Sequence, residues 1–211
     1  MNLLRRLDKD KKYYVAFSGG VDSVVLTHYL LQKGYNIILL NIDHLNDWSK
    51  IEKDFTIKFG VKYNLPCRLF SINRQPITGE SKEAIWSKER EAIFQQLEYN
   101  VLTGHHLDDA VEWYVMTTLG QGKSYLLNYQ NENIFRPLLL VKKEDIIEYA
   151  VKHNLDYLVD PSNLEDNALR NKVRLKLLPE ITQVFPGIRK VVRKLILNKE
   201  QKYVQWVNKI P

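Results

Sequence analysis

The stretch that decides the fold is Ser18-Gly19-Gly20-Val21-Asp22-Ser23 (SGGVDS), which lies between two apolar segments. The preceding run Tyr13–Phe17 (YYVAF) predicts a short buried strand, and residues 24–32 predict a helix. Two glycines at such a turn let the backbone approach an anion closely, and the turn amides, the helix dipole and both serine hydroxyls can point at it. The stretch therefore predicts a phosphate-binding strand, loop and helix. A Gly-Gly turn capped by serine is the simpler alternative.

The alternation of strand and helix continues along most of the chain. Further strands are expected at residues 36–43, 67–72, 101–104 and 134–140, with a short extended piece at 157–159. Helices are expected at residues 49–63, 80–97, 108–119 and 142–153. This order predicts an α/β fold, a doubly wound and mostly parallel sheet with helices on both faces. Ligands of such sheets bind beyond the carboxyl ends of the strands, so we expect the site in the loops after Phe17, Asp43, Ile72 and Gly104.

Length and charge suggest one domain and a basic extension. A chain of 211 residues, 45% of them hydrophobic, is long enough to bury one substantial core. From Arg170 to Pro211 there are eleven lysines and arginines against Glu180 and Glu200, so this tail carries +9 while the whole chain carries +6. We expect a globular domain over residues 1–178 and a basic helical extension over residues 179–211. Such asymmetry is typical of polyanion binding, although a basic helix that only aids solubility is the alternative.

Composition disfavours membrane and disulfide proteins. The apolar runs are shorter than the roughly 20 residues that cross a bilayer, and the first residues lack the apolar core of a signal peptide. Cys67 is the single cysteine, so it cannot form an internal disulfide or build a cysteine-rich metal site. We expect a soluble cytoplasmic protein with no membrane partner.

A second constellation is Gly104–Glu112 (GHHLDDAVE), which follows an expected strand. If a helix begins near Asp108, then Asp108, Asp109 and Glu112 are three and four residues apart and share one face of its first turn. They would form an acidic cluster at the strand end. Alternatively, these acids stabilise the helix dipole and His105-His106 is a packing pair. A zinc site is less favoured, because the two histidines are adjacent and no cysteine assists.

A third stretch is Asp160–Asp166 (DPSNLED), followed by Arg170, Asn171 and Arg174. In isolation Asp-Pro-Ser-Asn is a turn with a helix cap. The two arginines are four residues apart on an expected helix, so they can meet phosphate or an RNA backbone.

SGGVDS resembles the signature of the PP-loop, or ATP-pyrophosphatase, family, whose members split ATP into AMP and pyrophosphate to activate a carbonyl-type oxygen. GHHLDDAVE and the D-x-S-N and R-N-x-x-R pattern of the third stretch resemble, in the same order, signatures of its tRNA(Ile)-lysidine synthetase branch. Asp43-His44 and Arg136-Pro137-Leu138-Leu139 resemble shorter segments of that branch. The resemblance implies a ligase that forms a carbon–nitrogen bond. Its reaction replaces the C2 oxygen of the wobble cytidine in a tRNA(Ile) with a CAU anticodon by free L-lysine, through an adenylated tRNA.

The resemblance also implies roles for residues of this chain. Catalytic roles fall on Asp22, Asp108, Asp109 and Glu112, without separating base, lysine ligand and magnesium ligand. Magnesium would bind Asp22 and Asp109. ATP would be bound by Ser18, Gly19, Gly20, Val21, Asp22, Ser23, Asp43 and His44. The remaining substrate contacts would come from His105, His106, Arg136, Asp160, Ser162, Asn163, Arg170, Asn171 and Arg174, and the extension would begin a tRNA-binding domain.

Three other functions are weaker alternatives. A PP-loop tRNA thiolase needs a persulfide or cluster cysteine, which Cys67 alone, inside an expected strand, hardly supplies. An NAD synthetase shares the first loop but has no need of a basic tail. A non-catalytic tRNA-binding module is disfavoured because Ser18, Asp22, Asp109 and Asn163 are present together.

Overall fold

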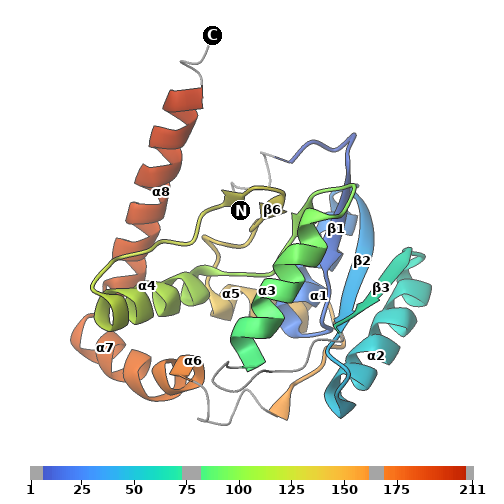
Figure 1. Ribbon diagram of the computed structural model, residues 1–211, viewed down its shortest axis with the longest axis horizontal. Coiled ribbons are helices and arrows are strands. Elements are labelled where there is room, and N and C mark those ends of the chain that lie inside the picture. The colour runs from blue at the N-terminus through green and yellow to red at the C-terminus, as the bar shows by residue number, and fades with distance from the viewer. Residues whose placement is uncertain (1–6, 73–81, 162–168, 208–211) are drawn as a thin grey trace.

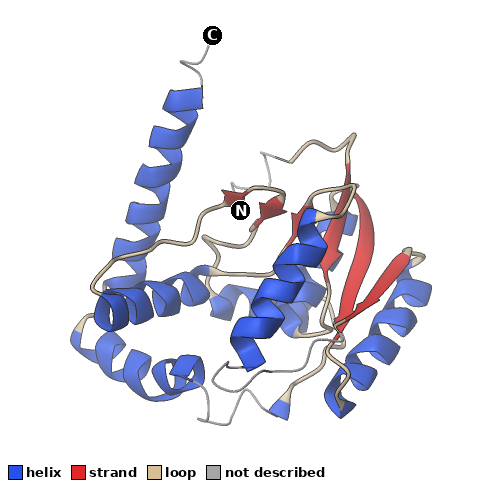
Figure 2. Ribbon diagram, viewed as in Figure 1, coloured by secondary structure: helices blue, strands red, loops and turns tan. Residues whose placement is uncertain are grey.

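The computed structural model of the chain describes residues 7–72, 82–161 and 169–207, with side chains except at residues 82–84 and 202–207. Its centre is one six-stranded sheet in the order β3-β2-β1-β4-β6-β5 (Figure 2). The strands are β1 (Lys12–Ala16), β2 (Asn36–Asp43), β3 (Cys67–Ser71), β4 (Val101–Leu102), β5 (Gln130–Asn131) and β6 (Ile134–Phe135). All neighbouring strands pair in parallel except β5 and β6. The predicted doubly wound, mostly parallel sheet is confirmed.

In the described part of the chain, four helices lie between strands and the others follow the last strand. They are α1 (Val21–Gln32), α2 (Asp47–Tyr63), α3 (Lys82–Gln95), α4 (Leu107–Gln121), α5 (Lys143–Lys152), α6 (Leu169–Lys172), a π-helical segment (Val173–Leu177), α7 (Leu178–Val184) and α8 (Ile188–Val207). No helix in the described part of the chain is both long and apolar enough to span a bilayer.

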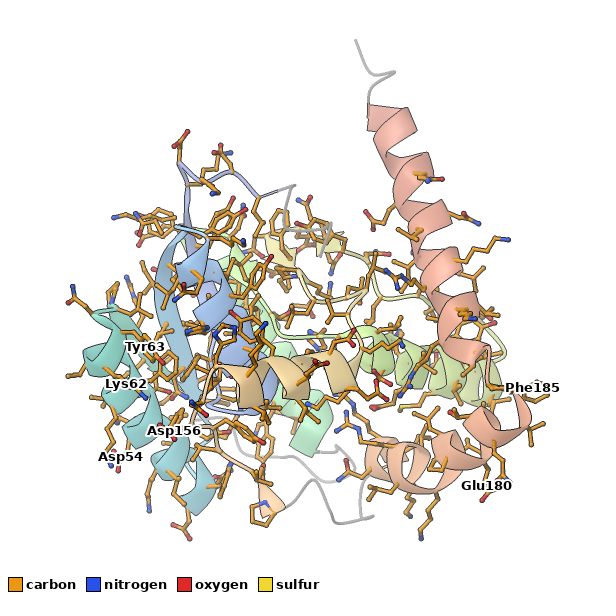
Figure 3. The ribbon with its side chains drawn as sticks, turned by 180° about the vertical axis from the view of Figure 1, so that it is seen from behind. Asp54, Lys62, Tyr63, Asp156, Glu180 and Phe185 are labelled. Carbon is orange, nitrogen blue, oxygen red and sulfur yellow. The ribbon has the colours of Figure 1, made fainter. Side chains whose placement is uncertain are left out.

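Side chains alternate between the two faces of the sheet, as the period of a strand requires. In and after β1, Tyr13, Val15 and Phe17 pack into a core with α1, α2 and α5, whereas Tyr14 packs into a core with α3. Figure 1 shows α3 in front of the sheet with α1 and α5 behind it, and Figure 3 shows the reverse side. On that reverse side the ion pair of Lys62 with Asp156, at 3.2 Å, ties the end of α2 to the segment after α5 (Figure 3).

A third core joins the C-terminal helices to the domain. Val192 and Ile196 of α8 are buried against Val111 and Val115 of α4. Farther along, α8 projects past the rest of the molecule (Figure 1). The helical chain runs without interruption from α6 through the π-helical segment into α7, and Pro179 is accommodated in the first turn of α7. The division into residues 1–178 and 179–211 stays a prediction.

Three segments differ from the predicted elements. The strand expected at residues 134–140 ends at Phe135, because Pro137 has no amide hydrogen to continue the ladder and a turn follows. The sequence analysis missed β5, whose two residues are polar and exposed and so show no apolar pattern. The extended piece at residues 157–159 is reduced to one bridge, between Leu158 and Gly20.

Candidate active site

The loop between β1 and α1 depends on Gly19. Its φ of +77° lies in the left-handed region, and a Cβ there would lie 2.8 Å from Phe55 Cδ1 and 2.9 Å from Leu158 Cδ1. The Leu158 amide donates to the Gly19 carbonyl at 2.8 Å, so the segment after α5 closes over the loop. Only glycine therefore fits this turn without displacing its neighbours.

The two serines of the loop have different environments. Ser18 is exposed, and its Oγ lies 3.4 Å from the Gly20 amide. Ser23 is buried, and its hydroxyl donates to the Gly20 carbonyl at 2.9 Å. The hydroxyl of Ser23 is thus engaged inside the first turn of α1, while that of Ser18 faces solvent.

The second motif packs directly on this loop. A Cβ on Gly104 would lie 3.1 Å from Asp22 Cβ and 3.3 Å from the Ser23 nitrogen. His106 caps the N-terminus of α4, and its Nε2 lies 3.6 Å from Asp22 Oδ1. The strand order reverses between β1 and β4, the position where doubly wound sheets bind ligands. Two motifs more than 80 residues apart therefore form one site.

A lysine that the sequence analysis missed lies beside this loop. Lys143, the first residue of α5, places its Nζ 2.6 Å from Asp22 Oδ1. Both side chains are one-third exposed, so the pair is open to an incoming anion. Its neighbour in sequence is also a lysine, and only the tertiary structure distinguishes the two.

Two of the predicted carboxylates bind two of the predicted arginines. Asp109 Oδ1 lies 2.8 Å from Arg170 Nη2 and 3.2 Å from Arg174 Nη2. Glu112 Oε2 lies 2.9 Å from Arg174 Nε, and Glu112 also accepts from Arg170 Nε. We call these four residues the arginine–carboxylate quartet. Its carboxylates are almost fully buried and its guanidiniums are partly exposed.

Asp108 has different ion-pair partners from Asp109 and Glu112, although its Oδ2 lies 3.9 Å from His106 Nδ1, and its catalytic role stays a prediction. Its Oδ1 binds Arg189 Nε at 2.7 Å, and its Oδ2 accepts the Lys143 amide at 2.8 Å. Asp109 instead accepts the His106 amide at 2.9 Å, a capping contact at the start of α4. Helical spacing determines the positions of the Cα atoms. The direction in which each carboxylate points depends on the cations and hydrogen-bond donors around it.

Comparison with known proteins identifies the family of the chain. A family model described as a PP-loop domain matches residues 1–181. The chain belongs to the PP-loop family. It is 30% identical over 198 residues to the tRNA(Ile)-lysidine synthase of Persephonella marina, covering 86% of this chain and 44% of that protein. It is 32% identical over 193 residues to that of Bacteroides thetaiotaomicron, covering 85% and 45%.

The chain thus spans a little less than half the length of these two curated relatives. Among solved structures it is similar to an NH3-dependent NAD synthetase from Campylobacter jejuni, with 14% identity, a TM-score of 0.47, and coverage of 99% of this chain and 91% of that chain.

The electrostatics of the site keep Asp109 charged and His105 neutral. Burial alone would raise the pKa of Asp109, but His106, His105 and Arg170 together hold that pKa below its ordinary value. Burial lowers the pKa of His105 to about 4, and its Nδ1 lies 2.9 Å from Thr103 Oγ1. A carboxylate of this kind holds a cation well and accepts a proton poorly.

Asp43 and His44 lie at the carboxyl end of β2. Asp43 Oδ1 accepts the Ser49 hydroxyl at 2.5 Å, which lowers the pKa of Asp43, and the Leu45 amide at 2.7 Å. His44 stacks on Trp86 with ring centroids 4.7 Å apart, and burial lowers its pKa to about 4. Asp43 therefore shapes the turn into α2, while His44 contributes a neutral aromatic surface.

The other predicted substrate residues are spread along the third motif and β6. Arg136 follows β6, and its Nη1 donates to the Asn128 carbonyl at 3.0 Å. Asn171 is half-buried in α6. Ser162 and Asn163 lie outside the described residues.

Asp160 acts on a carboxyl that the sequence analysis did not single out. Burial, and then the negative charge of Asp160, raise the pKa of Glu52 to about 7. Glu52 stands one turn before Phe55, the residue that contacts the PP-loop, so this group titrates near neutral pH beside the site. No local motif marks it, because the cause is its surroundings in the fold.

The two carboxylates predicted to bind magnesium flank one histidine. His106 Nε2 lies 3.6 Å from Asp22 Oδ1 and 3.4 Å from Asp109 Oδ2. Among the residues that the structure describes, no group of three or more His, Cys, Asp or Glu side chains is arranged to hold a metal ion. Magnesium is commonly held by one or two carboxylates together with substrate phosphates, so these residues fit a magnesium–nucleotide and not a closed protein cage.

Replacing Gly19 tests the packing of the PP-loop. Gly34 has a similar φ of +74°, but a methyl group there would have no atom within 4 Å, so Gly34 is a matched control. We expect Gly34→Ala to lower the free energy of unfolding by about 1 kcal/mol, and Gly19→Ala to lower it by a further 1 to 3 kcal/mol, roughly, from overpacking. Urea unfolding measures both, and equal losses would contradict the close contact with Phe55 and Leu158.

The pKa of Glu52 predicts a pH-dependent stability. Because the folded-state pKa is raised to about 7 from 4.5, the ionised form opposes folding, and the stability held below pH 4.5 is lost as the pH rises through 7. Glu52→Gln should therefore raise the free energy of unfolding at pH 8 by on the order of 1 to 2 kcal/mol, allowing for partial screening by solvent, with the gain disappearing toward pH 5. Asp54→Asn on the exposed face of α2 is the control. A gain that is independent of pH would contradict the assignment.

Proposed function

We propose that this chain carries the catalytic part of a tRNA(Ile)-lysidine synthase. The observation that carries the proposal is the meeting of the PP-loop and the acidic motif at one strand-end site, with Asp22, Lys143 and His106 between them. The names of the curated relatives support the same substrate, a tRNA(Ile), and the same class of enzyme, a ligase. Such an enzyme acts in the cytoplasm, where its tRNA is.

In the first step the wobble cytosine O2 attacks the α-phosphorus of ATP, and the bond to pyrophosphate breaks. This makes AMP the later leaving group, which is necessary because the cytosine oxygen alone leaves poorly. The amides of the PP-loop and the N-terminus of α1 would bind the departing pyrophosphate. Lys143, held beside the loop by Asp22, would add a positive charge to it. Asp22 and Asp109 would hold magnesium, which would supply further charge neutralisation.

In the second step the neutral ε-amine of L-lysine attacks C2 of the cytosine, the bond between C2 and the oxygen of AMP breaks, and the proton lost by the nitrogen passes to water. We assign Asp109 and Glu112 to holding lysine, because Asp109 stays ionised and holds cations. In the structure Arg170 and Arg174 occupy these carboxylates, so lysine must displace or share their contacts. A displaced guanidinium is then free to bind an RNA phosphate.

The basic extension is assigned to the RNA. On α8 the buried face carries Val192 and Ile196, while the exposed residues include Lys190, Arg193, Lys194 and Lys199. We propose that this exposed face contacts the tRNA backbone, as part of the extension over residues 179–211.

Incubation with ATP, labelled L-lysine and unmodified CAU tRNA(Ile) tests the proposal. We expect AMP and pyrophosphate to be released and label to enter the RNA. Asp22→Asn should lower the rate of AMP release by about a hundredfold, since the group that orients Lys143 and the phosphates is lost. Asp47→Asn removes an exposed carboxylate from the first turn of α2 and should leave the rate unchanged. Wild-type turnover in the Asp22 variant would refute its role.

Asp109→Asn separates lysine binding from RNA binding. The variant loses the negative charge that holds a cation but keeps its shape, so we expect incorporation of labelled lysine to fall by at least about tenfold. Binding of the tRNA, measured in a filter assay, should stay within about twofold of the wild type, a difference below 0.5 kcal/mol. Asp145→Asn, on the exposed first turn of α5, is the matched control. Equal incorporation by the two variants would remove Asp109 from the lysine site.

A further inference from the structure

One guanidinium joins three helices next to the active site. Arg189, in the first turn of α8, places Nε 2.7 Å and Nη2 2.5 Å from Asp108 Oδ1 at the start of α4. Its Nη1 lies 3.0 Å from Glu144 Oε1 at the start of α5. The planar guanidinium donates to two carboxylates in different directions, so it fixes both the distance and the angle between Asp108 and Glu144. A lysine ammonium would not fix them in this way.

Helix α8 by itself disfavours a cation at this position. The N-terminus of a helix carries a partial positive charge, and the first turn of α8 contains Arg189 and Lys190 but no acidic residue. Asp108 and Glu144 supply the compensating charge from two other helices. The side chains of Arg189 and Asp108 are 35% and 21% exposed, so this pair is better shielded from solvent than an ordinary surface ion pair.

The partners of Arg189 are direct neighbours of the active-site residues. Asp108 precedes Asp109, and its second oxygen accepts the backbone amide of Lys143 at 2.8 Å. Lys143 in turn reaches Asp22 of the PP-loop, at 2.6 Å. Leu107 at the start of α4 also donates to the Val141 carbonyl, at 2.9 Å, so the N-termini of α4 and α5 are joined at two levels.

We propose that Arg189 is a positioning residue. It clamps the first turns of α4 and α5 together, so that Lys143 stays on Asp22 and Asp109 stays at the edge of the PP-loop. Arg189 itself touches neither of these groups and acts through Asp108 and Glu144. The part of the test that uses reaction rate rests on the proposed function, whereas the part that follows Lys143 does not.

The alternative is a purely structural role, in which Arg189 holds α8 on the domain but does not position Lys143 or Asp109. Ile196, buried on α8 two turns further along, provides the matched control, since truncating it weakens the docking of α8 without touching Asp108 or Glu144. Ile196→Val and Ile196→Ala cover a range of stability losses, against which the loss in Arg189→Gln can be compared by the midpoint of urea unfolding.

The first measurement is the rate at which an amine-selective acylating reagent, in limiting amount, labels Lys143, followed by mass spectrometry of the full chain after digestion. We expect faster labelling of Lys143 in Arg189→Gln, a smaller increase in Arg189→Lys and in Glu144→Gln, and the wild-type rate in both Ile196 variants. Equal increases in Arg189→Gln and in an Ile196 variant of the same stability would overturn the proposal. Glu144→Gln removes only an exposed partner, so it gives a result even if Arg189→Gln does not fold.

The second measurement is the rate of AMP release with CAU tRNA(Ile). We expect kcat to fall by about tenfold to a hundredfold in Arg189→Gln while KM for ATP stays nearly constant, as for a misplaced catalytic group. The Ile196 variants should keep the wild-type kcat, and an equal loss in them would overturn the proposal. If the wild type releases no AMP, the proposed function fails, and the labelling of Lys143 alone decides the role of Arg189.

Discussion

The site depends on the close approach of two loops at the reversal of strand order. Gly104 has no side chain, so the turn after β4 rests against the backbone of Asp22 and Ser23, where a methyl group would lie within 3.4 Å of three atoms. Gly19 allows the PP-loop to turn beneath Leu158 in the same way. These two contacts bring β1, β4 and the segment after α5 together. A larger residue at either glycine would separate the anion-binding loop from the acidic helix, and neither half could carry out the proposed reaction alone.

Charge balance is the second constraint on this site. Asp22 faces Lys143, Asp108 faces Arg189, and Asp109 and Glu112 face two arginines. Removing one member of such a pair leaves a shielded charge without compensation, which costs more than the pair itself contributes. A charged ligand that replaces one partner of such a pair releases a group that must find another partner. On the proposed function, a nucleotide suits the pair of Lys143 and Asp22, because its phosphates can bind the ammonium and Asp22 would then be available to hold magnesium.

The sequence predicted those parts of the fold that depend on residues close together in the chain. Apolar runs of strand length and the glycines of SGGVDS located the sheet and the PP-loop, because backbone periodicity and left-handed turns leave a local pattern. Lys143, Arg189 and Glu52 could not be found in this way. Each owes its importance to partners on other helices, and each looks like any surface residue in sequence. The same reason explains Asp108: its spacing was read correctly, but its direction is set by the Lys143 amide and Arg189.

The arginine–carboxylate quartet links the proposed binding of lysine to that of RNA. A guanidinium binds a carboxylate through a fork of two donors, so a single ammonium competes poorly with Arg170 and Arg174 for Asp109 and Glu112. An RNA phosphate shifts this competition towards lysine, because the displaced guanidinium can bind the phosphate through the same two donors. This effect is reciprocal by thermodynamic linkage. If bound RNA raises the affinity for lysine by some factor, bound lysine must raise the affinity for RNA by the same factor. On the proposed function, the quartet therefore favours a site in which amino acid and RNA are held together over one in which either is held alone.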